Sequence, residues 1–254
     1  MEPESGLFFD KIDRPKTMYD NPYASPYSVA AQPADARVEF YKKTYLHLAG
    51  SIVIFALLEA VLLQIPAMQK LAMVMMGSPI TWLITLGIYM FTSHIAQRWA
   101  MSTTSKGTQY AGLGLFIVAE AIIFTPLLLI ASVFAEGVIT QAAIITLAMT
   151  AGITFIAFTT KKDFSFLNGF LKIGFFVALG LIIAASFIGG LTLGLWFAVA
   201  MVVLASVAIL RDTSNIIHHY STTQYVAASL GLFASIALLF WYVIQILMSL
   251  SSND

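Results

Sequence analysis

Seven long apolar runs follow one another along the chain, and short polar or turn-forming segments separate them. Each run is close to the roughly 20 residues that an α-helix needs to cross a lipid bilayer. Proline and glycine mark several connections, because both residues favour turns over continued helix. The pattern predicts spans at about Thr44–Ile65, Ile80–Gln97, Gln109–Val133, Val138–Thr159, Asn168–Phe187, Leu191–Leu210 and Gln224–Met248.

Composition agrees with this pattern. Of 254 residues, 59% are hydrophobic and only 10% are charged, and the mean hydropathy is +0.86. Soluble domains carry about 25% charged residues, so we expect an all-α integral membrane protein. The chain has no cysteine and a formal net charge of zero. Disulfides are therefore excluded, and a nucleic-acid partner is not expected.

The first 43 residues or so differ from the rest, since they mix acids, bases and prolines without a helical period. A signal peptide would instead have a short basic start and an early apolar core. We therefore expect residues 1–43 to form a disordered cytoplasmic tail. Residues 44–250 are expected to form a single seven-helix transmembrane domain.

Lysine and arginine predict the orientation of the spans. Twelve of these residues lie in the N-terminal segment and in every second connection, or just inside a span beside one, whereas Lys70 alone lies in the alternate connections. Basic residues collect in cytoplasmic loops. The pattern therefore predicts a cytoplasmic N-terminus and an external C-terminus.

Three acidic side chains interrupt the apolar runs: Glu59, Glu120 and Asp212. A carboxylate at membrane depth costs several kcal/mol unless it is neutralised, paired or hydrated. These three residues are therefore the first candidates for a functional site. The sequence contains no GxSxG, HExxH or Walker A motif, so we expect neither catalysis nor a resident metal site.

Three short motifs occupy corresponding places in this pattern. Lys43–Leu48 opens the first span, Lys161–Leu167 joins the fourth and fifth spans, and Asp212–His218 closes the sixth. In this order on seven spans, the motifs resemble the Bax inhibitor-1 family, the transmembrane Bax-inhibitor-motif proteins, and especially its bacterial YccA-like branch. The resemblance covers about Phe40 to Leu247.

The resemblance implies both a fold and a function. The implied fold is a helical bundle around a central seventh helix, in the bacterial inner (plasma) membrane. Family members are described as pH-sensitive calcium leak channels, and YccA-like members as modulators that bind the membrane protease FtsH. The lipid bilayer, FtsH, and calcium or protons are therefore the expected partners, with no resident cofactor.

One position departs from the family pattern. Calcium-leak members pair the acid at the end of the sixth span with a second acid in the seventh span. Here the first acid is Asp212, but the second position is Ser235. The resemblance therefore implies an incomplete two-acid pH sensor in this chain.

Asp212 is expected at the cytoplasmic end of the sixth span, where it either simply reaches water or forms part of a gate. Arg98 lies at the same face of the membrane, at the end of the second span. An ion pair between Asp212 and Arg98 would hold the helix ends together. Protonation of Asp212 would then favour opening.

Glu120 is predicted near the middle of the third span, as a neutral hydrogen-bonded acid or as a cation or proton site. It lies about eleven residues from the cytoplasmic end of its span, as Ser235 does, so both are roughly 16 Å deep. We therefore expect Glu120 to pair with Ser235, or with Asp212 through water. Glu59 is expected nearer the outer leaflet. It either lines an outer vestibule for cations, or it is an acid that snorkels to the interface or packs between helices.

Overall fold

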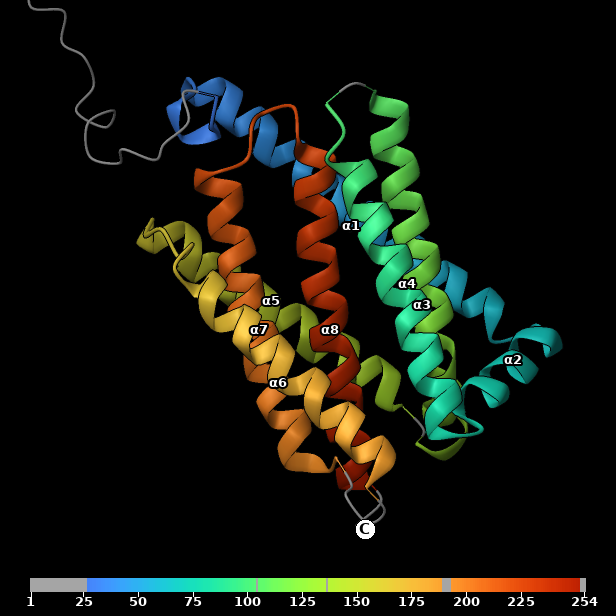
Figure 1. The fold of residues 1–254 in the computed structure, drawn as a ribbon. Helices are drawn as coiled ribbons and strands as arrows, with labels where there is room; N and C mark the ends of the chain where they lie inside the picture. Colours follow the sequence, from blue (N-terminus) through green and yellow to red (C-terminus); the bar gives the residue numbers. More distant parts are fainter. Residues whose placement is uncertain (1–26, 104, 136, 189–192, 252–254) are drawn as a thin grey trace, which may run out of the picture.

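The computed structural model describes residues 27–103, 105–135, 137–188 and 193–251. In this part of the chain the backbone forms eight α-helices and one short 3-10 helix, and the only β pairing is an isolated bridge between Ser28 and Ser221 (Figure 1). The elements in chain order are η2 (Val29–Ala31), α1 (Ala34–Leu62), α2 (Pro66–Met76), α3 (Pro79–Ala100), α4 (Lys106–Phe134), α5 (Val138–Thr160), α6 (Leu167–Phe187), α7 (Leu195–His218) and α8 (Tyr225–Ser251).

Seven of these helices, all except α2, are long and apolar enough to cross a membrane. The prediction of an all-helical protein with seven spans is therefore confirmed. Most boundaries agree within four residues, but α7 continues eight residues past the predicted end at Leu210. Asp212 consequently lies inside α7, where it is buried, rather than at the end of the helix.

The N-terminal boundary was predicted wrongly. Helix α1 begins at Ala34, ten residues before the expected start at Thr44. An ion pair of 2.6 Å between Lys43 and Glu39 supports this extra length, because residues four apart lie on one helix face. Val29 is fully buried, and its N–H donates to the carbonyl of Tyr220 at 2.7 Å. Residues 27–43 are therefore part of the folded domain, whereas residues 1–26 lie outside the described part.

The connection between the first two spans contains a helix that the sequence pattern did not predict. Helix α2 has Pro66 in its first turn, a position where the missing N–H of proline costs nothing. Ser78 then caps α3 by accepting the N–H of Thr81 at 3.1 Å, and the Thr81 hydroxyl accepts the N–H of Ser78 at 3.0 Å. This reciprocal capping marks the start of a new helix. Helices α2 and α3 are therefore separate elements.

The seven long helices alternate in direction and so define two ends of the bundle (Figure 1). One end, which we call the Asp212 end, contains the starts of α1, α4, α6 and α8 and the ends of α3, α5 and α7. Lys106, at the start of α4, donates to the carbonyl of Thr223 beside α8 at 2.7 Å. The opposite end, which we call the α2 end, contains α2 and the end of α8 (Figure 1).

Helix α8 lies at the centre of the bundle and packs against α1, α3, α4, α5 and α7. Its buried residues include Leu232, Phe233 and Leu239, which contribute to the main hydrophobic core. Helix α6 is the opposite case, since Ala178 is its only fully buried residue. An apolar helix with so much exposed surface is typical of contact with lipid. A central seventh helix agrees with the fold that the resemblance implied.

Candidate functional site

The carboxylate of Asp212 lies between α7 and α8, where only 5% of the residue is exposed. The Ser235 hydroxyl of α8 donates to Oδ2 of Asp212 at 2.5 Å. The Arg211 guanidinium forms an ion pair with Oδ1 at 2.8 Å. Asp212 and Ser235, the two positions that the family pattern aligns, therefore come together in this chain. The Ser235 bond crosses between helices, whereas Arg211 precedes Asp212 on the same helix.

The end of α7 around Asp212 is buried although its side chains are polar. Asp212, Thr213 and Ser214 are consecutive polar residues, and each is at most 5% exposed. Helix α8, which packs on α7, has small buried residues such as Ala228 near its start, and small residues permit close helix approach. Tyr220 lies beside them in the connection to α8, where burial and then the negative charge of Asp212 raise its pKa to about 12.

The predicted ion pair between Asp212 and Arg98 is not formed. Arg98 is exposed on α3, and among the described residues Asp212 has its ion pair with Arg211. The reason is the packing order, because α3 packs mainly on α4 while α7 packs mainly on α8 and α5. Two helix ends at the same face of a membrane need not be neighbours, so depth alone did not predict the contact.

The three sequence motifs converge at the Asp212 end. The N–H of Phe164, in the connection between α5 and α6, donates to the Ser214 hydroxyl at 2.8 Å. Nε2 of His219 lies 3.0 Å from Oδ2 of Asp163 in the same connection. Tyr45 of the first motif lies beside Thr213 of the third. The motifs therefore fasten α1, the α5–α6 connection and the end of α7 to one another.

Asp163 is the acid of this convergence that lies outside the membrane-spanning helices. Partial burial alone would raise its pKa, but hydrogen bonds from the backbone N–H of Ser165 and from His219 outweigh burial and lower the pKa below its usual value. The Ser165 bond measures 2.8 Å. Asp163 is therefore held ionised as part of the connection between α5 and α6.

Glu120 was predicted to pair with Ser235, or with Asp212 through water, and the first pairing is wrong. Glu120 is 4% exposed on α4, and its Oε2 instead accepts the hydroxyl of Tyr89 on α3 at 2.5 Å. Ser235 donates its proton to Asp212. The sequence reasoning missed Tyr89, although a tyrosine in the middle of an apolar span is a signal that its hydroxyl has a buried partner.

Glu59 lies on α1 and is 4% exposed, which excludes the snorkelling alternative. Its polar neighbours include Thr125 and Glu120 of α4. Neither carboxylate oxygen of Glu59 has a hydrogen-bond partner among the described residues. Glu59 therefore lies near enough to Glu120 for their charges to interact, a proximity that the sequence reasoning did not predict.

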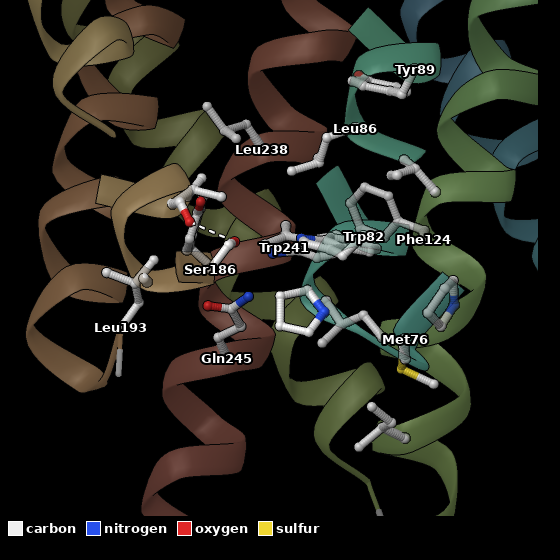
Figure 2. Close-up of a pocket in the computed structure, with 18 of the residues that line it drawn as sticks. Met76, Trp82, Leu86, Tyr89, Phe124, Ser186, Leu193, Leu238, Trp241 and Gln245 are labelled. Carbon is white, nitrogen blue, oxygen red and sulfur yellow. Dashed lines mark hydrogen bonds between the residues drawn. The ribbon is translucent and has the colours of Figure 1, made fainter. Parts of the chain in front are cut away.

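A cavity of about 610 Å³ lies beside Glu120, between α3, α4, α6 and α8. Figure 2 shows Trp82, Tyr89, Trp241 and Gln245 around it, with Met76 toward α2. Trp82 and Trp241 stack in its wall with ring centroids 6.0 Å apart. The cavity is mostly apolar with a few polar groups, as small-molecule and ion-access cavities commonly are.

The fold and this site define a multi-pass α-helical membrane protein with acids buried inside the bundle. The family model described as Inhibitor of apoptosis-promoting Bax1 matches residues 37–253. That range is most of the chain, so the chain belongs to this family.

Three relatives are similar to parts of the chain. An uncharacterised protein of Pseudomonas aeruginosa is 39% identical over 43% of this chain. Bax inhibitor 1 of Schizosaccharomyces pombe is 32% identical over 48% of it. The modulator of FtsH protease YccA of Escherichia coli is 38% identical over 35% of it. The matched segments cover 49%, 46% and 40% of those relatives' own lengths.

Another relative from Escherichia coli is named inner membrane protein YccA and is 38% identical over 35% of this chain. Together with the seven apolar helices, this likeness supports a multi-pass location in the bacterial inner membrane.

Proposed function

We propose that this protein is a pH-sensitive calcium or cation leak channel that is gated at the Asp212 end. The observation that carries the proposal is the buried carboxylate of Asp212, which joins α7 to α8 through the 2.5 Å hydrogen bond from Ser235. Carboxylate and hydroxyl oxygens are also the ligand types that calcium prefers. The resemblance to calcium-leak members supports the same function.

The gate follows from the charges around Asp212. In the ionised state the carboxylate attracts Arg211 and accepts a charge-assisted hydrogen bond from Ser235. A proton on Asp212 removes the attraction to Arg211 and weakens the bond from Ser235. The contact between α7 and α8 then loosens at this end, and acid opens the path. The basic partner in this gate is Arg211 rather than Arg98.

The orientation is part of the proposal. Among the described residues, the basic side chains of the connections gather at the Asp212 end, while Lys70 lies at the α2 end. This distribution supports a cytoplasmic Asp212 end and N-terminus and an external C-terminus. The gate would then respond to cytoplasmic pH.

Calcium uptake into liposomes that contain the purified protein tests the proposal. We expect uptake above that of protein-free liposomes, and a changed rate in Asp212→Asn. Glu39→Gln is the matched control, because Glu39 is an exposed acid at the same end whose partner is Lys43. The proposal fails if wild-type liposomes take up no more calcium than protein-free liposomes, or if the two variants behave alike.

A second candidate function is the modulation of a membrane protease without conduction. The likeness to the modulator of FtsH protease YccA favours it, and so does the N-terminal segment that precedes the bundle. The family names point to a role other than catalysis for either candidate.

Removal of residues 1–26 separates the two functions, because η2 and α1 begin after this segment and would remain intact. A truncated protein that still leaks calcium but no longer co-purifies with FtsH would assign the segment to the protease. If full-length protein does not co-purify with FtsH either, the modulator function is excluded for this pair.

A further inference from the structure

Glu59 and Glu120 form a pair of buried carboxyl groups that the gate at Asp212 does not use. Each residue is only 4% exposed, and they lie on the neighbouring helices α1 and α4. None of the ion pairs among the described residues involves either of them. Two carboxylates in an apolar site cannot both remain ionised without a compensating cation.

The hydrogen bonds around the pair are asymmetric. Tyr89 donates its hydroxyl proton to Glu120 at 2.5 Å, which stabilises a negative charge on Glu120. Thr125 donates its only hydroxyl proton to the carbonyl of Ala121 at 2.9 Å, so it offers Glu59 only an acceptor. Among the described residues, neither oxygen of Glu59 has a hydrogen-bond partner. Glu59 is therefore the member of the pair that must carry a proton.

A further buried polar group lies beside Tyr89. Ser93 is one turn beyond Tyr89 on α3, and its side chain interacts with that of Tyr89. The residue is 7% exposed, and its hydroxyl has no hydrogen-bond partner within the described chain. Ser93 therefore adds a further polar side chain to the buried surroundings of Tyr89.

Buried phenylalanine side chains pack against one another beside this pair. Phe55 and Phe116 each lie one helical turn before Glu59 and Glu120, and α1 and α4 both run from the Asp212 end. The ring of Phe233 contacts both of them, with centroids 5.9 Å from Phe55 and 6.1 Å from Phe116. All three rings are buried, and Phe55 also packs on Phe124, one turn beyond Glu120, with centroids 5.2 Å apart. The rings therefore form an apolar cluster beside the pair.

The cavity connects Glu120, the member of the pair that lines it, with the opposite end. Glu120 and Tyr89 belong to its wall, and the wall continues to Met76, Ser78 and Leu193 at the α2 end. Figure 2 shows Met76 and Leu193 at the end of the cavity away from Tyr89. Its volume of about 610 Å³ far exceeds the roughly 10–15 Å³ that one water molecule requires.

Few other titratable groups face the pair. Tyr89 of α3 binds Glu120, and Tyr242 of α8 lines the same cavity. Helix α5 contains no titratable side chain, and the cavity-lining residues of α6 and α7 carry none. Lys70 of α2 is exposed. Among the described residues, no basic side chain lines the cavity. The charge of the pair is therefore best compensated by a proton.

We propose that Glu59 and Glu120 share one exchangeable proton, which enters through this cavity from the α2 end. They form a proton-binding site that is separate from the gate at Asp212. Glu59 carries the proton, Glu120 carries the charge, and Tyr89 fixes this assignment. The site does not depend on whether the protein conducts calcium.

Dicyclohexylcarbodiimide tests the site directly, because this reagent modifies protonated carboxyl groups in apolar surroundings. The purified full-length protein is labelled over a range of pH, and the modified residue is found by mass spectrometry. We expect the label on Glu59, with a yield that falls as the pH rises. In Glu120→Gln the neighbouring negative charge is absent, so the midpoint for Glu59 should shift to lower pH. In Tyr89→Phe part of the label should move to Glu120.

Asp212→Asn and Glu39→Gln are the controls, and neither should change the labelling of Glu59. Unfolding temperatures show whether each variant is folded, and the conservative Tyr89→Phe keeps the test valid if a glutamine variant is not. An unlabelled Glu59, or an unchanged midpoint in Glu120→Gln, would overturn the proposal. So would complete protection of Glu59 by calcium at constant pH, since the pair would then be a metal site.

The route of entry has its own measurement. The chain has no cysteine, so Gln245→Cys places a single thiol in the cavity wall. A bulky thiol reagent there should slow hydrogen–deuterium exchange of the protonated carboxyl, followed by its infrared C=O band. The same reagent on Thr223→Cys, at the Asp212 end, should leave the exchange rate unchanged. Equal slowing by both modifications would contradict entry from the α2 end.

Discussion

At the level of single residues, Asp212 has two neighbours with different roles. Arg211 compensates the charge from the same helix, whereas Ser235 connects Asp212 to the central helix. In family members with a second acid at the Ser235 position, one proton would be shared by two carboxyl groups. Serine supplies its own proton instead, so the connection forms while Asp212 is ionised.

Removal of the Ser235 hydroxyl tests this connection. Ser235→Ala leaves a buried carboxylate oxygen without its donor, so we expect the free energy of unfolding to fall by about 1–2 kcal/mol. Ser229→Ala is the matched control, because the hydroxyl of Ser229 bonds to Val226 of its own helix at 2.8 Å. Thermal unfolding in detergent measures both changes. Equal losses of stability in the two variants would show that the bond from Ser235 to Asp212 stabilises the fold no more than a bond within one helix.

The basic partner of Asp212 can be tested by the same kind of comparison. Arg211→Gln removes the charge that favours ionised Asp212, so calcium leak should begin at higher pH than in wild type. Arg98→Gln removes an exposed charge that has no ion pair among the described residues, and it should leave the pH dependence of the leak unchanged. A shift in Arg98→Gln but not in Arg211→Gln would restore the original sequence-based pairing.

At the level of elements, α3 and α4 are in close backbone contact at Gly112. A Cβ atom there would lie 2.5 Å from the backbone of Ala96 and Ala100, and backbone cannot move aside as a flexible side chain does. Gly112→Ala should therefore push the helices apart and destabilise the fold by about 1–3 kcal/mol. Gly114→Ala should not, because nothing lies within 4 Å of its Cβ position.

Unfolding temperatures of the two alanine variants measure this difference. Because α3 carries Tyr89 and α4 carries Glu120, Gly112→Ala should also weaken the Tyr89–Glu120 bond. Similar unfolding temperatures for both variants would mean that the contact between α3 and α4 is looser than described.

The connection between α5 and α6 predicts a pH dependence of stability. The pKa of Asp163 is lowered by its hydrogen bonds in the folded state, so ionised Asp163 favours folding. This contribution is complete above the ordinary pKa of 3.8 and is lost as the pH falls through the lower folded value. Because the side chain is about one-third exposed, we expect at most about 1 kcal/mol.

The measurement is the difference in unfolding free energy between wild type and Asp163→Asn at neutral and at strongly acidic pH. The difference should shrink on acidification. A difference that grows, or that stays constant, would show that the Asp163 carboxylate does not stabilise this connection.

At the level of the whole molecule, hydrophobic periods predicted the helices well and their contacts poorly. Seven spans were predicted because a bilayer demands long apolar runs, and length alone identifies them. Helix α2 was missed because the residues between Pro66 and Pro79 are mostly apolar and look like a continuation of the first span. The early start of α1 was missed because its first turns are polar and mostly exposed, so they carry no apolar pattern.

The site shows the same limit. Asp212, Glu59 and Glu120 were recognised as candidates because acids are rare in apolar runs. Their partners could not be derived, because the rotation of each helix and the packing order decide which side chains meet. Depth in the membrane suggested Ser235 for Glu120, yet the rotation of α4 directs Glu120 toward Tyr89 on α3.

The most direct test of the central claim is calcium flux as a function of pH, in liposomes with wild type or Asp212→Asn. Asparagine cannot ionise, so it imitates protonated Asp212. We expect wild-type flux to rise as the pH falls, and Asp212→Asn to leak at a high rate that does not respond to pH. An equal pH response in both proteins, or no flux above protein-free liposomes at any pH, would contradict the gate at Asp212.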